Sequence, residues 1–189
     1  EFMQMQAGIA EVAHHMDLPV FGTAGCTDSH TLDGQAAAEA AMSILVAMET
    51  GANLVHDCGY TGFGSAGSVY QTVMDDEIIG MVRRIIGGIQ VDDENLALHD
   101  IERAGPAGEF ITSQHTFQNF RQNWVPALIN RMRYSEWKSK AQSTSMGDRI
   151  KQKTRTILEQ HQVTPLPKEV LAEIAKIIDR AENREAKKS

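Results

Sequence analysis

The chain alternates twice between a short apolar run, a polar loop and an amphipathic segment long enough for a helix of several turns. The apolar runs, Leu18–Gly25 and Asn53–Asp57, are typical of short buried strands. The polar loops that follow are Cys26–Asp33 and Cys58–Ser68, and the helical segments are Gly34–Thr50 and Val69–Ile86. Short strands that alternate with helices indicate parallel strands joined by crossover helices. The sequence therefore predicts an α/β fold.

Local signals fix the ends of the two predicted helices. Asp33 stands where an N-cap is needed, and Gly51 stands just past the end of the first helix, where a left-handed residue is usual. Gly87 and Gly88 end the second helix. A third helical pattern lies at the N-terminal end of the chain, where apolar residues repeat at helical spacing: Met5, Ile9, Val12 and Met16. No capping residue precedes it. We expect that N-terminal helix to be uncapped.

The alternation stops after Gly88. A short strand is predicted at Phe110–Thr112. The remaining segments are predicted to be helical: Asp92–Arg103, Thr116–Trp124, Pro126–Met132, Tyr134–Lys140, Gly147–His161 and Lys168–Glu185. The last of these is amphipathic, and we expect its apolar side chains to be packed inward: Val170, Ile174, Ile177 and Ile178. We expect residues 3–112 to carry the strands, and residues 113–189 to form a helical region.

Composition excludes several classes of protein. Of 189 residues, 42% are hydrophobic and 23% are charged, as in ordinary globular domains. No apolar run approaches the roughly 18 residues that a membrane span needs, and no signal peptide is visible. Two cysteines are too few for a disulfide scaffold. We expect a cytoplasmic protein that does not bind membranes.

Charge is distributed unevenly along the chain. Residues 1–110 hold 17 acidic and 3 basic residues, a net charge of −14, whereas residues 111–189 hold 8 acidic and 15 basic residues, a net charge of +7. An acidic half disfavours nucleic acid and attracts a cationic substrate or a basic partner. The basic charges of the second half are interleaved with acids, as on a solvated helical face. We expect no nucleic-acid binding.

The chemistry of such a fold lies in the loops at the carboxyl ends of its strands. Cys26, His56 and Cys58 come from these ends, and their side chains suit tetrahedral zinc. Free cysteines are also common as small buried hydrophobic residues, and we expect no metal. His56 and Asp57 are either a hydrogen-bonding pair that faces the substrate or a cap for the loop backbone.

The second loop is rich in glycine, which permits close approach of the backbone to a ligand. Within it, Tyr60 and Phe63 are candidates for an aromatic cage around a quaternary ammonium group. The alternative is a flexible connection. Further along, Asp75-Asp76-Glu77 is expected to be a solvated helix face, and His115 is a weaker site candidate near the predicted strand end. His14 and His15 are expected at the surface.

Four long stretches, in this order, carry a family resemblance. They are Leu18–Asp28, Gly51–Tyr60, Met74–Val82 and His115–Arg121, the last followed by Trp124 and Pro126. Together they resemble the C-terminal part of the trimethylamine methyltransferase (MttB-like) family, from about Met5 to Glu182.

The resemblance implies a fold and an activity. The fold would be the C-terminal part of a (β/α)8 TIM barrel with a helical C-terminal extension. The activity would move a methyl group from a methylamine, or from a quaternary amine such as glycine betaine, to cob(I)alamin or a related corrinoid. The corrinoid would belong to a separate partner protein, so no tightly bound cofactor is expected. Members that use trimethylamine carry pyrrolysine, whose position we expect within Gly22–Asp28. This chain has none, which favours a quaternary amine.

On that resemblance, site residues can be assigned. Asp28, His56 and Asp57 are the expected catalytic group, with Asp28 or Asp57 balancing the substrate cation. The expected substrate-binding residues are Cys26, Tyr60, Phe63, Ser65 and His115.

The chain is much shorter than members of that family. The N-terminal helix begins without a cap, and Glu1-Phe2 resembles a cloning remnant. We therefore expect a C-terminal fragment that associates with itself or with another chain, or rearranges, and that is inactive alone, because two strands cannot close a barrel.

Two other functions stay open. One is a zinc-thiolate methyltransferase that uses Cys26, His56 and Cys58. The other is a non-catalytic oligomerisation or docking module formed by the helical C-terminal half.

Overall fold

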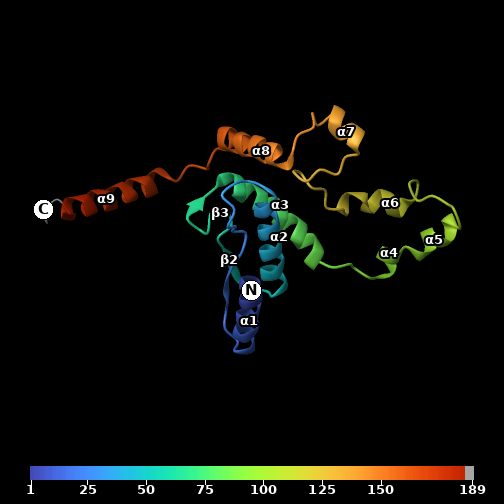
Figure 1. The fold of residues 1–189 in the computed structure, drawn as a ribbon, viewed down its shortest axis with the longest axis horizontal. Coiled ribbons are helices and arrows are strands. Elements are labelled where there is room, and N and C mark those ends of the chain that lie inside the picture. Colours follow the sequence, from blue (N-terminus) through green and yellow to red (C-terminus); the bar gives the residue numbers. More distant parts are fainter. Residues whose placement is uncertain (186–189) are drawn as a thin grey trace. The chain divides into compact units, whose positions relative to one another are not determined.

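A parallel β-α-β unit lies at the centre of the fold, as the sequence predicts. The computed structural model describes residues 1–185 (Figure 1). Strand β1 (Phe21–Thr23) leads through α2 (Gly34–Glu49) to β2 (Leu54–His56), which pairs with it in parallel, and α3 (Val69–Ile86) follows. The register pairs Thr23 with His56, so the two strands end side by side and direct their following loops to the same edge.

The core lies where α2 packs against α3 (Figure 1). Helix α2 contributes small side chains, among them Ala36 and Ala40, which are fully buried. Helix α3 contributes larger ones, Met74, Ile78 and Val82. Alanines on one helix let the bulky side chains of the other approach closely, as the close packing of a protein interior requires.

Both strands are shorter than the predicted apolar runs. Strand β1 ends before Gly25 (φ +76°), and β2 ends before Asp57, which has a positive φ of 78°. A residue in the left-handed region cannot continue a strand. At the other end, the backbone N–H of Val20 donates to Asn53 Oδ1 at 2.8 Å, and the backbone N–H of Asn53 donates to the Val20 carbonyl at 3.1 Å.

The predicted caps are confirmed. The Asp33 carboxylate accepts the backbone N–H of Ala36 at 3.0 Å at the start of α2. Gly51 adopts φ +71° just after the same helix ends. Helix α1 (Phe2–His15) has no side-chain cap, and His14 and His15 are exposed.

The segment that follows β2 contains a small hairpin, where the sequence predicts only a loop. Strand β3 (Tyr60–Thr61) pairs antiparallel with β4 (Ala66–Gly67). Phe63 lies at its tip with φ +59° and is 87% exposed. The hairpin holds Tyr60 in a regular conformation beside the end of β2.

The chain beyond α3 is helical but more broken than predicted. Its elements are α4 (Asp93–Leu96), α5 (Leu98–Ala104), α6 (Gln114–Asn119), the 3-10 helix η1 (Phe120–Gln122), α7 (Tyr134–Ser139) and α8 (Met146–Gln160). The single predicted helix Asp92–Arg103 is wrong, because Ala97 is left-handed (φ 47°) and divides it. The strand predicted at Phe110–Thr112 is a coil and turn, and the helix predicted at Pro126–Met132 is a series of bends.

A buried acid, Glu77, explains why the segment Pro126–Met132 is not helical. Glu77 Oε1 accepts the backbone N–H groups of Leu128 at 2.7 Å and of Ile129 at 3.0 Å. The Leu128 carbonyl accepts Arg149 Nε at 2.8 Å. These bonds, together with the buried side chains of Leu128 and Ile150, hold this segment against α3. The prediction of a solvated Asp75-Asp76-Glu77 face is wrong for Asp75 and Glu77, which are buried, and confirmed only for Asp76.

The chain divides into two compact units, Glu1–Arg155 and Thr156–Ser189. Helix α9 (Lys168–Glu185) belongs to the second unit and is amphipathic, as predicted. Its apolar side chains, which we expected to be packed inward, are exposed: Val170, Ile174, Ile177 and Ile178. None of the helices in the described residues is long and apolar enough to span a bilayer.

Candidate functional site

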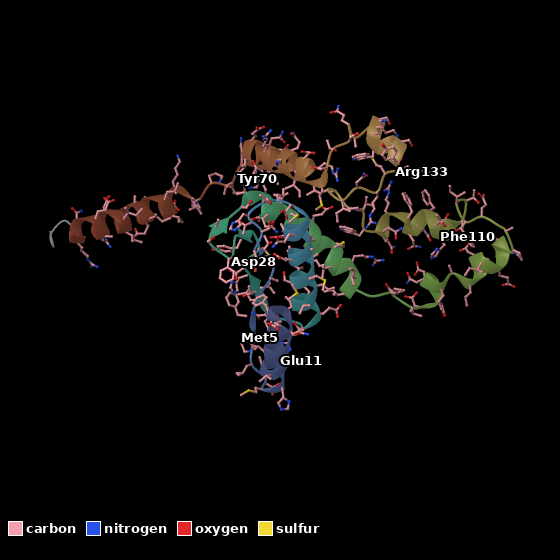
Figure 2. The ribbon with its side chains drawn as sticks, in the orientation of Figure 1. Met5, Glu11, Asp28, Tyr70, Phe110 and Arg133 are labelled. Carbon is pink, nitrogen blue, oxygen red and sulfur yellow. The ribbon has the colours of Figure 1, made fainter. Side chains whose placement is uncertain are left out.

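A pocket of about 750 Å³ opens at the carboxyl ends of β1 and β2. Asp28, on the loop between β1 and α2, lies in its wall (Figure 2). Five of the predicted site residues line it: Cys26, Asp28, Asp57, Tyr60 and Phe63. The other lining residues come from α1, β1, the loop after β1, α2 and the hairpin: Phe2, Met3, Thr23, Thr27, Glu39, Ser43 and Gly64. The two polar loops therefore form one site.

Backbone hydrogen bonds join the two loops into a continuous rim. The N–H of Thr27 donates to the Tyr60 carbonyl at 3.1 Å, and the N–H of Gly62 donates to the Ser29 carbonyl at 2.9 Å. The backbone of Tyr60 is thus fixed relative to that of Thr27, the residue before Asp28. Rigid support of this kind lets a pocket bind without ordering its own walls first.

His56 supports the pocket from behind. Its Nδ1 lies 2.6 Å from Asp57 Oδ1, and its Nε2 lies 3.2 Å from the Thr23 hydroxyl. The ring stacks on Phe21 with 4.1 Å between centroids. Both partners, Asp57 and Thr23, line the pocket, whereas His56 does not. The pair is therefore a hydrogen-bonded unit in which Asp57 is the member that faces the cavity.

Glu39, which the sequence analysis missed, is a third carboxylate in the pocket wall. Its Oε2 accepts the Thr27 hydroxyl at 2.5 Å and the backbone N–H of Asp28 at 2.9 Å. These hydrogen bonds, the one from Thr27 foremost, lower the pKa of Glu39, so it is ionised at neutral pH. The only signal in the sequence was one glutamate within an alanine-rich helix, which by itself indicates a solvated position.

The two cysteines do not form the metal site that their spacing allowed. Cys58 Sγ donates to the Ala24 carbonyl at 3.6 Å. Burial raises the pKa of the Cys58 thiol to about 11 and also raises that of Cys26. Within residues 1–185, no three His, Cys, Asp or Glu side chains are grouped to hold a metal ion. The left-handed Asp57 breaks the strand alternation that would have placed His56 and Cys58 on one face.

A buried carboxyl, Asp75 of α3, supports the turn behind the pocket. Its Oδ2 accepts the backbone N–H of Gly59 at 2.7 Å, and its Oδ1 accepts Gln71 Nε2 at 2.9 Å. Burial raises the pKa of Asp75 to about 7. The site is tight, because a Cβ on Gly25 would lie 2.7 Å from Cys58 Sγ and 3.3 Å from Asp75 Oδ2.

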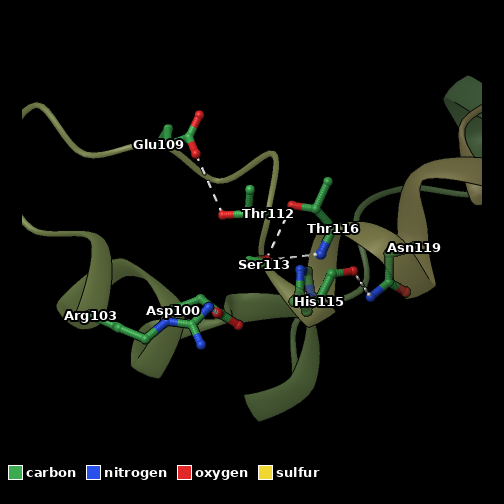
Figure 3. Close-up of polar contacts among 8 residues, drawn as sticks. All are labelled: Asp100, Arg103, Glu109, Thr112, Ser113, His115, Thr116 and Asn119. Atoms are coloured by element: carbon green, nitrogen blue, oxygen red, sulfur yellow. Dashed lines mark hydrogen bonds and ion pairs between the residues drawn. The ribbon is translucent and has the colours of Figure 1, made fainter.

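Like His56, the predicted residues Ser65 and His115 are not among those that line the pocket. The Ser65 hydroxyl donates to the Gly62 carbonyl inside the hairpin. His115 lies in α6, whose start is capped by Ser113 Oγ accepting the N–H of Thr116 at 3.0 Å (Figure 3). The His115 carbonyl accepts Asn119 Nδ2 at 2.9 Å, and its ring Nε2 is buried without a partner among the described residues.

Ser43 gives a direct test of how α2 supports the first loop. Its buried hydroxyl accepts the backbone N–H of Gly25 at 3.1 Å and donates to the Glu39 carbonyl at 2.8 Å. Ser43→Ala leaves the Gly25 N–H unpaired, and we expect a loss of about 1–2 kcal/mol in urea unfolding. The matched change Ser139→Ala removes an exposed hydroxyl that bonds only its own helix, and it should leave stability nearly unchanged. Equal losses in both variants would contradict the assigned role.

Comparison with known proteins identifies the family. The family described as Trimethylamine methyltransferase (MTTB) matches residues 1–186. Trimethylamine methyltransferase MttB of Desulfitobacterium hafniense is 31% identical over 183 residues, which are 97% of this chain and 37% of that protein. The protein of the same name from Methanosarcina barkeri is 29% identical over 94% of this chain and 36% of its own length.

A relative named for a different substrate also matches. Glycine betaine methyltransferase of Desulfitobacterium hafniense is 36% identical over 130 residues, 68% of this chain and 27% of that protein. The chain spans little more than a third of the length of the two trimethylamine methyltransferases. The match to the family nevertheless extends over nearly all of its residues, and the chain belongs to the trimethylamine methyltransferase (MttB) family.

Proposed function

We propose that a protein carrying this chain transfers a methyl group from a methylated amine to the Co(I) corrinoid of a partner protein. The observation that supports this most is the pocket wall, where Asp28, Glu39 and Asp57 lie with Tyr60 and Phe63. Carboxylates and aromatic faces both attract an ammonium group, and the aromatic contribution is worth about 0.5–2 kcal/mol per ring. Family membership independently indicates a methyltransferase.

The residues of this chain would bind and orient the amine. Transfer breaks the C–N bond, the nitrogen keeps the electron pair, and the methyl group passes to the corrinoid, which supplies the nucleophilic metal. A quaternary nitrogen leaves as a neutral amine, so no proton transfer to nitrogen is required. Asp57, held by His56 at 2.6 Å, would fix the cation relative to its acceptor, and positioning of this kind accounts for much of a transfer rate.

The fold around this pocket is a further part of the proposal. The parallel pairing of β1 with β2, and the pocket at their carboxyl ends, are what two neighbouring strands of a (β/α)8 barrel would provide. We expect the remaining strands to come from other residues of the protein, and the active form to be a cytoplasmic homo-oligomer.

Methyl transfer can be measured directly. A polypeptide of the relatives' length that contains these residues is mixed with a methylated amine and cob(I)alamin, and methylation is followed by absorbance. We expect turnover with at least one of tetramethylammonium, trimethylamine and glycine betaine, and loss of most of it in Asp57→Asn. The exposed neighbour of Asp75 supplies the control, Asp76→Asn, which should retain full activity. No turnover with any amine would contradict the proposal.

A further inference from the structure

The pocket wall that this chain builds carries three carboxylates, one of which, Asp57, is paired with His56 at 2.6 Å. Asp28, Glu39 and Asp57 all line it, and no lysine or arginine is among the described residues that do. The lack of lysine and arginine extends beyond the pocket, because the first 82 residues of the chain contain neither. All lining residues lie within residues 2–64.

Hydrogen bonding fixes one of these charges in place. Glu39 accepts from the Thr27 hydroxyl and from the backbone N–H of Asp28, both at 2.9 Å or less. Those donors lower the pKa of Glu39. Glu39 therefore keeps its negative charge at neutral pH. Moving its carboxylate away from the loop would break both hydrogen bonds.

The substrates for which the relatives are named differ in net charge. Trimethylamine is a cation when protonated, whereas glycine betaine is a zwitterion. The carboxylate of a betaine is one carbon away from the ammonium nitrogen, so both charges must enter the same pocket. Near Asp28, Glu39 and Asp57 the ammonium group is attracted and the carboxylate is repelled.

We infer that this pocket selects methylated amines that are net cations over zwitterionic betaines. The inference rests on the proposed function and names the substrate class for the same site. The selecting groups are Asp28, Glu39 and Asp57, and the aromatic rings of Tyr60 and Phe63 are common to both ligand classes because each has a methylated ammonium group.

The test compares two ligands that differ chiefly in the carboxylate. Isothermal titration of the 189-residue chain with tetramethylammonium and with glycine betaine, at low ionic strength, should give at least about tenfold tighter binding of the cation. Added salt should reduce that ratio, because screening weakens both the attraction and the repulsion. This second measurement needs no variant.

Two charge-neutralising variants test whether the preference for the cation arises in the pocket wall. Glu39→Gln keeps an acceptor for the loop but removes one charge, and it should lower the affinity ratio by about threefold. Glu49→Gln makes the same change at an exposed position of the same helix, outside the pocket wall, and should leave the ratio unchanged.

The outcomes separate the two proposals. Equal or tighter binding of glycine betaine overturns the charge selection and leaves the site as an amine site. A ratio that Glu39→Gln does not alter, or that Glu49→Gln alters equally, also overturns it. Failure of both ligands to bind overturns the pocket as an amine site, whereas the proposed function is overturned only by the absence of turnover in the longer polypeptide.

Discussion

Glu77→Ala is expected to destabilise residues 1–155 by about 2–4 kcal/mol, because it leaves two backbone N–H groups without an acceptor. Glu77 Oε1 lies 2.7 Å from the N atom of Leu128 and 3.0 Å from that of Ile129. Leu128 is part of the hydrophobic core, so water cannot fully replace the lost partner. Urea unfolding followed by circular dichroism measures the loss.

Two further variants separate the hydrogen bonds from the general effect of changing an acid in α3. Glu77→Gln retains a side-chain oxygen in the same place and should recover more than half of the lost stability. Asp76→Ala changes the exposed neighbour and should shift the unfolding free energy by less than about 0.5 kcal/mol. A glutamine variant as unstable as the alanine variant would contradict the proposed anchor.

Asp75→Asn is expected to remove a pH dependence from folding stability. Burial raises the pKa of Asp75 from 3.8 to about 7, so the folded state retains a proton that the unfolded state releases between these values. Stability from this group is therefore present below pH 3.8 and is lost as pH rises to 7. The loss is of the order of 4 kcal/mol, at about 1.4 kcal/mol per pKa unit. The asparagine variant should be the more stable protein at pH 8, with little difference at low pH.

The surroundings of Asp75 favour its neutral form. Gln71 Oε1 is buried and has no hydrogen-bond partner among the described residues. A half-turn of the Gln71 amide would let this oxygen accept from a protonated Asp75 or from an asparagine at that position. Urea unfolding at pH 5 and pH 8 tests this, with Asp76→Asn as the exposed control. A steady fall in stability from pH 5 to pH 8 that persists in Asp75→Asn would contradict the account.

The β-α-β unit could be predicted because its signals are local. The apolar run around Val55, the N-cap at Asp33 and the glycine at Gly51 each specify their own segment, and the alternation of strands with helices implies parallel pairing. The broken helices after α3 lacked such signals. Ala97 carries no mark of a left-handed conformation, and the bends around Leu128 depend on a hydrogen bond to Glu77, 51 residues earlier in the chain.

The part of the candidate site that follows the two parallel strands could be predicted from the sequence. Cys26, Asp28, Asp57, Tyr60 and Phe63 follow two neighbouring parallel strands, so their convergence at one edge follows from the fold. Glu39 was missed because it reaches the pocket from a helix and is recognisable only by its contacts with Thr27 and Asp28.

Other assignments failed for local reasons. Ser65 bonds within the hairpin that the sequence analysis treated as a loop. His115 follows a predicted strand that does not form, so the strand-end argument does not apply to it.

The central claim is that the two loops form a single site for a methylated ammonium ion. It is tested most directly by titrating the 15N-labelled chain with tetramethylammonium and following the backbone amide resonances. We predict that the amides of Cys26–Asp28 and Tyr60–Gly64 shift together with one affinity, while those of α9 do not move. Shifts confined to one loop, shifts centred on α9, or no shifts at all would contradict the claim.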